Sequence, residues 1–400
     1  MMAEWHLITG EYPPMPGGVA DYSRHVAVWL REAGGRVHVW CPGEPGGEAV
    51  EGDVVVHREP AGFSPAGMRR MGEALDRQAR PRRLLVQWVP HAYGYRAMNV
   101  PFCAWLLARS RLAGDEVLVM VHEAHVAFGE SGRANVIAAV NRLMDLLLMR
   151  AADRVWVGTP AWAEALRPYR RSGARSFDWL PVPSNVPRVR DTEATRRIRA
   201  SYAAPGGGLI GHFGTYGGRI APLLDELLPK LLEGDSTVRV LLLGRGAADY
   251  RARFAGEHAA LALRLWAPSG LDDHELSVHL AAPDLFVQPY PEGLTCRRGS
   301  AMAVMGHGQP MVSNSGLLTE PIWTDSAAAV LVPFAGGMTA MAQATLRLLK
   351  DAEERARLAE AADRLYADRF DVVHTVAAFH HAAAAEAAPD ARASLEAGRS

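Results

Sequence analysis

Short apolar runs alternate with longer amphipathic stretches along almost the whole chain. The runs include residues 6–9, 84–87 and 117–121 in the first half, and residues 238–243 and 285–287 in the second. Each run is continuously apolar, which is typical of parallel strands buried on both faces, and the stretches between them have helical periodicity. The pattern predicts an α/β fold in which helices cover both faces of mostly parallel sheets.

A chain of 400 residues is too long for one ordinary hydrophobic core. The alternation of strands and helices stops at residues 180–187, where three prolines in seven residues form a stiff, extended connector. We therefore expect two Rossmann-like domains that face each other across a cleft, with ligands at the carboxyl ends of the strands. The expected parts are residues 1–187, residues 188–375, and a C-terminal helix with a flexible tail at residues 376–400.

Composition excludes several classes of protein. A formal net charge of −1 argues against a general nucleic-acid-binding protein, which normally has a basic excess. Cys41, Cys103 and Cys296 have no C-x-x-C spacing, so we expect neither a zinc site nor disulfides, as is typical of the cytoplasm. No signal-peptide pattern and no run of about 18 apolar residues is present, so no transmembrane segment is expected. The apolar stretches at residues 105–107 and 146–149 fit the core, with contact to lipid as the alternative.

The first predicted strand leads into a glycine- and proline-rich loop, residues 10–18, that ends in Gly17 and Gly18 before a helix. Paired glycines at this place allow a ligand to approach the backbone and the positive end of the helix dipole. The spacing is not the G-x-G-x-x-G of dinucleotide-binding proteins, so no nicotinamide or flavin cofactor is expected. A helix cap after a proline turn is the structural alternative.

A second loop, residues 289–300, combines a carboxylate with two arginines after another apolar run. Backbone N–H groups at the start of the next helix suit a phosphate, and Arg297 and Arg298 can add charge-assisted hydrogen bonds. Glu292 can accept hydrogen bonds from hydroxyl groups. The loop predicts a site for a phosphorylated, hydroxyl-rich ligand such as a sugar nucleotide, and an ordinary strand-to-helix connection is the alternative.

The segments Glu-Tyr-Pro-Pro…Gly-Gly-Val-Ala-Asp-Tyr and Pro-Tyr-Pro-Glu-Gly…Ser-Ala-Met-Ala resemble two signatures of the retaining GT-B glycosyltransferases of family 4. The second signature is the E-x7-E region of that family. The resemblance covers nearly the whole chain in order and spacing. It implies the GT-B fold, an acceptor on the N-terminal domain, a nucleotide sugar on the C-terminal domain, and no metal or other cofactor.

The resemblance also implies roles for individual residues. His122 matches a histidine near the transferred sugar, and Glu292 matches the glutamate that holds donor-sugar hydroxyls. The residues expected at the donor diphosphate are Gly17, Gly18, Gly214, Arg219, Gly293, Leu294, Thr295, Arg297 and Arg298.

The chain departs from the family pattern in two places. Ser300 stands where the family has its second glutamate, and a serine cannot hold the ribose diol bidentately as a carboxylate can. We still expect Ser300 and Gly244 on the ribose and base side. Where relatives carry an arginine and a lysine, this chain has only Arg219, so we infer that Arg297 or Arg298 supplies the missing charge.

The acceptor side is predicted at the aromatic loop of residues 87–95. Aromatic faces stack on sugars, and amide and imidazole groups bond to hydroxyls, so Gln87, His91 and Tyr93 are the candidates. Aromatic packing between the domains is the alternative. His125 is a further candidate, with a structural loop histidine as its alternative reading.

The expected function is retaining transfer of a hexose from a nucleoside-diphosphate sugar to a hydroxyl of a glycan, a lipid or a natural product. No carboxylate is placed as a nucleophile, which fits a front-face displacement and not a two-carboxylate glycosidase. A hydrolysing sugar-nucleotide 2-epimerase and a non-catalytic GT-B scaffold are the alternatives. Ser300 and the missing lysine favour the scaffold, whereas His122 and Glu292 argue against it.

Overall fold

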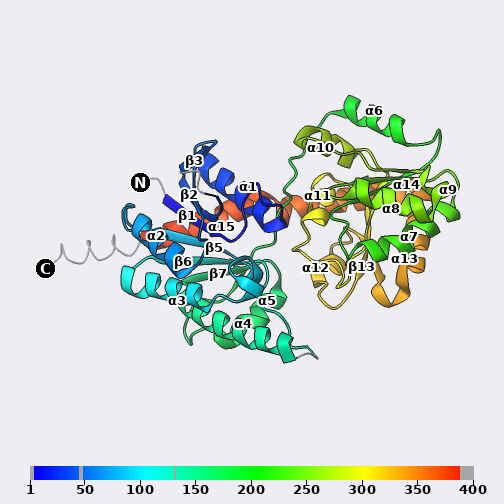
Figure 1. The fold of residues 1–400 in the computed structure, drawn as a ribbon. Helices are drawn as coiled ribbons and strands as arrows, with labels where there is room; N and C mark the ends of the chain where they lie inside the picture. Colours follow the sequence, from blue (N-terminus) through cyan, green and yellow to red (C-terminus); the bar gives the residue numbers. More distant parts are fainter. Residues whose placement is uncertain (1–3, 45–47, 130–131, 388–400) are drawn as a thin grey trace. The chain divides into compact units, whose positions relative to one another are not determined.

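The computed structural model describes residues 4–44, 48–129 and 132–387. The chain divides into two compact units, which are Met1–Pro181 with the chain from Val372 onward, and Val182–Asp371. The first boundary therefore lies six residues before the one expected from the prolines. The chain returns to the first unit at Val372, four residues before the expected C-terminal segment begins (Figure 1).

The described part of the first unit contains an eight-stranded sheet with the order β3-β4-β2-β1-β5-β6-β7-β8. Neighbouring strands are parallel except for the antiparallel pair β3–β4. The strand order reverses between β1 and β5, and ligands of such sheets bind at this kind of switch point. The strands are β1 (Glu4–Thr9), β2 (Arg36–Pro42), β3 (Glu48–Glu51), β4 (Val54–Glu59), β5 (Arg83–Trp88), β6 (Glu116–Val121), β7 (Arg154–Val157) and β8 (Asp178–Trp179).

The last described helix packs on the first sheet and not on the second. The ring of Phe379 lies 6.4 Å from that of Trp5 in β1 and 4.9 Å from that of Trp156 in β7, and Phe379 is fully buried. Burial of these large aromatic surfaces explains why the end of the chain belongs to the first unit. The helices of this unit are α1 (Gly18–Glu32), α2 (Pro65–Leu75), η1 (Pro90–Ala92), η2 (Tyr95–Ala97), α3 (Val100–Ala108), η3 (Arg109–Ala113), α4 (Gly132–Ala151), α5 (Pro160–Leu166), η4 (Arg167–Tyr169) and α15 (Val372–Ala387).

The second unit contains a six-stranded, fully parallel sheet with the order β11-β10-β9-β12-β13-β14. Its order reverses between β9 and β12. Gly211 in β9 allows this pairing, because a Cβ atom there would lie 2.4 Å from the ring of Phe286 in β12. The strands are β9 (Leu209–Phe213), β10 (Arg239–Leu243), β11 (Leu265–Trp266), β12 (Leu285–Gln288), β13 (Met311–Ser315) and β14 (Val330–Pro333).

Helices cover this sheet as the alternation of the sequence predicted. They are α6 (Thr192–Tyr202), α7 (Ala221–Gly234), α8 (Ala247–Glu257), α9 (Ala259–Ala262), α10 (Asp273–Ala281), α11 (Gly299–Gly306), α12 (Pro321–Asp325), η5 (Phe334–Gly336), α13 (Gly337–Lys350), α14 (Ala352–Leu365) and η6 (Tyr366–Phe370). The prediction of an α/β fold with mostly parallel sheets is confirmed. Within the described ranges, no helix combines the length and apolar character needed to cross a bilayer.

Candidate functional site

The carboxyl edge of the first sheet brings the glycine loop and His122 to one end of the unit. Gly17 caps α1, and a Cβ atom there would lie 2.5 Å from the Glu11 carboxylate. Gly18 begins α1, and a Cβ atom there would have no neighbour within 4 Å. A side chain at Gly17 would displace the Glu11 carboxylate, and Gly18 leaves the backbone at the helix start open to a ligand.

His122 directly follows β6 and is held by the neighbouring strand. Its Nε2 lies 2.9 Å from Oε1 of Gln87, a residue of β5. Because an amide oxygen can only accept, the imidazole donates from Nε2 and keeps the lone pair of Nδ1. The edge of the ring faces Tyr22 of α1 at a centroid distance of 4.7 Å. Burial lowers the pKa of His122 to about 4, so the imidazole is neutral at pH 7 and can orient hydroxyl groups.

Gln87→Glu is expected to raise the pKa of His122 from about 4 by roughly one to three units, because a carboxylate beside the ring stabilises the imidazolium. Histidine NMR titration measures this shift directly. If His122 is needed in its neutral form, the acid limb of the activity profile should move toward neutral pH by the same amount. Gln343→Glu in α13 makes the same change of charge at an exposed position and should leave His122 unchanged. An unchanged His122 pKa in Gln87→Glu would contradict the assignment.

Two carboxylates that sequence reasoning missed flank His91. Its Nε2 lies 3.7 Å from Glu11 Oε1, and its Nδ1 lies 3.6 Å from Glu123 Oε2. The His91 side chain is 57% exposed, and burial raises the pKa of Glu11. Glu11 lies in the glycine loop and Glu123 follows His122, so their positions after strands were the available signal. The group can accept hydrogen bonds from a hydroxyl-rich molecule.

Two predicted acceptor residues do not face a ligand. Tyr93 is 2% exposed, and its hydroxyl donates to the carbonyl oxygens of Ile8 and Gln87 at 3.0 and 2.7 Å. Its ring stacks on Phe102 inside the core of the first unit. The prediction that Tyr93 stacks on an acceptor is therefore wrong. The prediction that Gln87 contacts the acceptor is also wrong, because its side chain is fully buried and is hydrogen-bonded to His122.

His125 is hydrogen-bonded to a buried carboxyl group instead of facing an open site. Its Nδ1 lies 2.7 Å from Oδ2 of Asp145 in α4, and its side chain is 13% exposed. Burial raises the pKa of Asp145, while the bond to His125 acts in the opposite direction. This contact matches the structural alternative for His125.

The carboxyl edge of the second sheet gathers the predicted charged residues. The Glu292 carboxylate pairs with Arg298 at 2.5 Å and also with Arg219, whose side chain is 70% exposed. The guanidinium of Arg298 lies 4.8 Å from the ring centre of Tyr290. Arg297 is partly buried in the same loop. Two arginines and one carboxylate thus meet next to the switch point between β9 and β12.

The loop that carries these residues uses its own N–H groups internally. Gly293 donates to the Tyr290 carbonyl at 3.1 Å, and Leu294 donates to the Asn314 carbonyl at 2.8 Å. The prediction that these two N–H groups are free for a diphosphate is therefore wrong. Gly293 has φ of 89°, and a Cβ atom there would lie 2.3 Å from the Gly316 nitrogen, so this glycine shapes the turn. Thr295 is fully buried.

Glu320, which precedes Pro321 at the start of α12, supports the same loop. Its carboxylate accepts from the Cys296 N–H at 3.1 Å and from the indole of Trp323 at 3.0 Å. Glu320 is 6% exposed, so these bonds satisfy a buried charge. The position before a proline gave no signal of this role, because the partner lies in another loop.

The residues predicted for the ribose and base lie close together. A Cβ atom at Gly214 would be 3.6 Å from Ser300 Oγ, and a Cβ atom at Gly244 would be 2.3 Å from the Gly214 carbonyl. Ser300 Oγ is hydrogen-bonded to the Tyr290 hydroxyl at 2.9 Å. His212 was not predicted here. It lies beside Gly214, its Nδ1 donates to the Val287 carbonyl at 2.9 Å, and burial lowers its pKa to about 4.

Residues 17–183 match the family model of the glycosyl transferase 4-like domain. Sucrose-phosphate synthase from Thermosynechococcus elongatus has the same fold, with a TM-score of 0.74 and 16% identity over 96% of this chain and 99% of that one. The chain thus contains a stretch similar to the glycosyl transferase 4-like domain and has the GT-B fold of these solved enzymes.

Other solved GT-B structures also have this fold, at low sequence identity to the chain. Anabaena Alr3699/HepE in complex with UDP aligns with a TM-score of 0.69 and 16% identity over 96% of this chain and all of that one. WaaG, a glycosyltransferase of lipopolysaccharide biosynthesis, aligns with a TM-score of 0.61 and 15% identity over 92% and 96% of the two chains. No curated protein sequence matches the chain.

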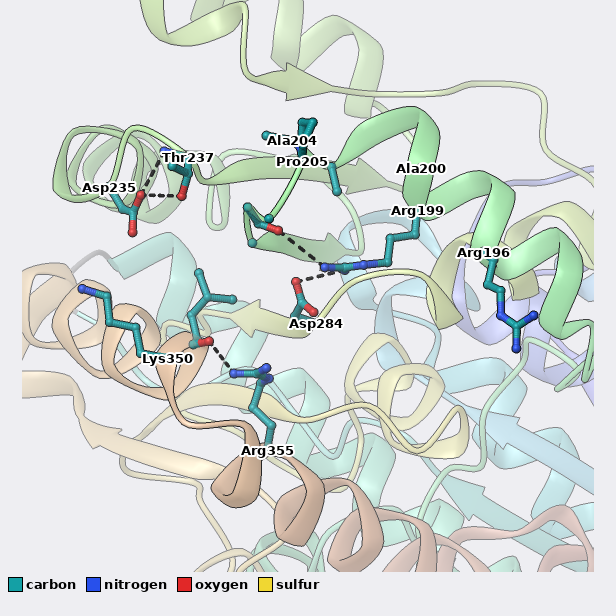
Figure 2. A pocket seen from close by; sticks show the side chains of 15 residues that line it. Arg196, Arg199, Ala200, Ala204, Pro205, Asp235, Thr237, Asp284, Lys350 and Arg355 are labelled. Carbon is teal, nitrogen blue, oxygen red and sulfur yellow. Dashed lines mark hydrogen bonds and ion pairs between the residues drawn. The ribbon is translucent and has the colours of Figure 1, made fainter.

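The second unit also has a hollow of about 650 Å³ at the amino edge of its sheet (Figure 2). Its two carboxylates are already bonded within the protein. Asp284 accepts from the Leu209 N–H at 2.8 Å and pairs with Arg199 at 2.9 Å, and Asp235 accepts from Thr237 at 2.7 Å. The residues that line this hollow are distinct from the predicted site residues, which follow the carboxyl ends of the strands.

Proposed function

We propose that the chain transfers a hexose from a nucleoside-diphosphate sugar to an acceptor hydroxyl, with retention of configuration and without a metal ion. The convergence of Glu292, Arg219 and Arg298 at the switch point of the second sheet carries this proposal. A carboxylate can hold sugar hydroxyls, and two guanidinium groups can bind a diphosphate through charge-assisted hydrogen bonds. These are the two chemical parts of a nucleotide sugar that lie on either side of the bond to be broken.

The arginines would stabilise the leaving diphosphate as its negative charge develops. Arg219 and Arg298 now share the charge of Glu292, so a donor diphosphate would compete for the same guanidinium groups. In a front-face displacement the leaving oxygen takes the acceptor proton, and no protein nucleophile is needed. The neutral His122 would orient hydroxyls of the transferred sugar.

Further support concerns the nucleotide. HepE, which has the same fold, is solved with UDP, so UDP is the first nucleotide to test. Among the residues that the structure describes, no three His, Cys, Asp or Glu side chains are grouped to hold a metal ion. Ser300 would offer its hydroxyl to the ribose by exchanging its bond to Tyr290. A cytoplasmic location stays a prediction.

Calorimetric titration with UDP, GDP, ADP and TDP tests the donor site. We expect one nucleotide to bind, and Arg298→Ala and Arg219→Ala each to weaken it roughly tenfold, because each removes a charge-assisted bond. Arg347→Ala in α13 removes an exposed arginine elsewhere in the same unit and should bind as the unchanged protein does. Absence of binding for all four nucleotides would favour the scaffold alternative.

Product analysis separates transfer from the epimerase alternative. The donor is a sugar conjugate of the nucleoside diphosphate that binds. Transfer should require an acceptor and should give a glycoside with the anomeric configuration of the donor, which NMR determines. A hydrolysing 2-epimerase would instead release the free epimerised sugar without any acceptor. Loss of activity with EDTA would contradict the metal-independent mechanism.

A further inference from the structure

The buried imidazole of His212 uses only one of its two ring nitrogens. His212 lies in β9 and is 2% exposed, and its Nδ1 lies 2.9 Å from the Val287 carbonyl oxygen in the neighbouring strand β12. Because a carbonyl oxygen can only accept, Nδ1 donates this bond. Burial lowers the pKa of His212 to about 4, so the ring is neutral at pH 7 and Nε2 keeps its lone pair.

The lone pair of Nε2 is an unusual feature for a folded protein. Nε2 of His212 is buried, and it has no hydrogen-bond partner among the residues that the structure describes. Buried polar atoms are nearly always paired, because a buried acceptor without a partner loses its bonds to water and gains nothing in return. The position of this acceptor therefore points to a group that binds there.

The acceptor lies beside Gly214, directly after the end of β9. A Cβ atom at Gly214 would lie 3.9 Å from His212 Nε2 and 3.6 Å from Ser300 Oγ, with no nearer neighbour than Ser300. These are ordinary contact distances, so this side of the Gly214 backbone is open and is bordered by two polar side chains. A ligand group that occupies it can reach both His212 and Ser300.

The chemistry of the two side chains selects the kind of ligand group. Nε2 can only accept, and the oxygens of an ionised phosphate have no proton to donate, so a phosphate does not fit beside His212. A serine hydroxyl has one donor and two acceptor sites, and the bond of Ser300 to Tyr290 at 2.9 Å uses one of them. An acceptor next to such a hydroxyl suits a vicinal diol, in which each hydroxyl group can both donate and accept.

The nearby carboxylates already have partners. Glu292 is paired with two arginines, and Glu320 accepts from a backbone N–H and from an indole. Ser300 stands where a second glutamate would hold both hydroxyls of a diol, and one serine hydroxyl cannot replace both carboxylate oxygens. His212 supplies the acceptor that the serine lacks.

We propose that His212 and Ser300 together bind the ribose diol of the donor nucleotide, with Nε2 of His212 accepting from one hydroxyl and Oγ of Ser300 bonded to the other. The inference rests on the proposed function, because it needs a nucleotide at the carboxyl edge of the second sheet. It makes His212 a specificity-determining residue. A nucleotide that lacks the hydroxyl leaves a buried acceptor unpaired, and sites of this kind discriminate well against such analogues.

Calorimetric titration with UDP, 2′-deoxy-UDP and 3′-deoxy-UDP tests the proposal, and the matching analogues are used if GDP or ADP binds instead. The unchanged protein should bind UDP roughly three- to tenfold more tightly than each analogue, the effect of one neutral hydrogen bond. His212→Phe keeps a ring but has no acceptor, so one of the two analogues should bind to it as tightly as UDP does. Ser300→Ala should remove the preference against the other analogue. Comparing affinities within one variant cancels any general effect of the substitution.

His279→Phe is the matched control. His279 is also buried in the second unit, and its Nδ1 lies 2.6 Å from the Glu275 carbonyl oxygen in α10. This variant should discriminate between UDP and the analogues as the unchanged protein does. Nitrogen-15 NMR of the unchanged protein needs no variant: UDP should shift the Nε2 resonance of His212, and the analogue that lacks its hydroxyl partner should not.

The outcomes separate this inference from the proposed function. Equal binding of UDP and both analogues, or full discrimination in folded His212→Phe, would overturn the inference and leave the nucleotide site intact. A change of base preference in His212→Phe with unchanged discrimination between the analogues would assign His212 to the base and would also overturn it. Binding of TDP alone, whose sugar lacks the 2′-hydroxyl, would do the same. Absence of binding for every nucleotide would overturn both the inference and the proposed function.

Discussion

Glu292→Gln is expected to lower the rate of sugar transfer by roughly 10²- to 10³-fold, the size of effect seen when one preorganised transition-state contact is removed. The amide keeps the shape of the side chain but loses the charge that Arg219 and Arg298 now share. It therefore cannot accept strong hydrogen bonds from the sugar hydroxyls as the carboxylate can. Initial rates at varied donor concentration separate the change in kcat from the change in KM.

The binding of the free nucleoside diphosphate distinguishes this role from a structural one. Without the carboxylate both arginines are available to the diphosphate, so nucleotide affinity should be retained or increased in Glu292→Gln. Glu226→Gln in α7 makes the same substitution at an exposed position and should keep full activity. If Glu292→Gln lost nucleotide binding together with activity, or kept its activity, the assignment of Glu292 to the sugar would be wrong.

Asp115→Asn is expected to destabilise the first unit by up to about 3–5 kcal/mol, because it leaves two buried arginines with only the half-exposed Asp76 as a counter-charge. Asp115 is 3% exposed and lies just before β6. Its Oδ1 is 2.6 Å from Nε of Arg82 and its Oδ2 is 2.6 Å from Nε of Arg109. Arg82 and Arg109 are themselves buried. Urea unfolding followed by circular dichroism measures the loss as an earlier transition of this unit.

Asp178→Asn is the matched control for that change. Asp178 pairs with Arg154 at 2.9 Å on the same sheet, but its side chain is 42% exposed. Solvent screens such a pair, so its loss should cost less than about 1 kcal/mol. Equal effects of the two substitutions would show that burial of Asp115 with Arg82 and Arg109 does not determine how much they contribute to stability.

The strands were predictable where an apolar run is long and continuous, as in β6 and β10. Such runs are buried on both faces of a parallel sheet, and burial selects the residue type directly. A short apolar run such as residues 261–265 does not by itself predict its element. There α9 (Ala259–Ala262) precedes β11 (Leu265–Trp266), since a five-residue apolar run fits a buried helical turn as well as a strand.

The charged part of the candidate site was predictable because its residues follow the carboxyl ends of strands. Glu292 and Arg298 share one loop, and Arg219 follows the neighbouring strand β9, so their meeting follows from the order of elements. Which backbone N–H groups of the loop are free to bind a ligand was not predictable in this way. The N–H of Leu294 is bonded to Asn314 in the next strand, and no local pattern marks such a partner.

The sequence by itself determined the alternation of strands and helices, the two-part division and the residues that follow the strand ends. These properties depend on local propensity and on apolar periodicity, which each segment carries with it. Only the tertiary structure decided that Tyr93 lies in the core, that Glu320 supports the loop of residues 289–300, and that Glu11 and Glu123 flank His91. Each of these depends on which distant segment fills the neighbouring space, and close packing fixes that only when the whole unit has formed.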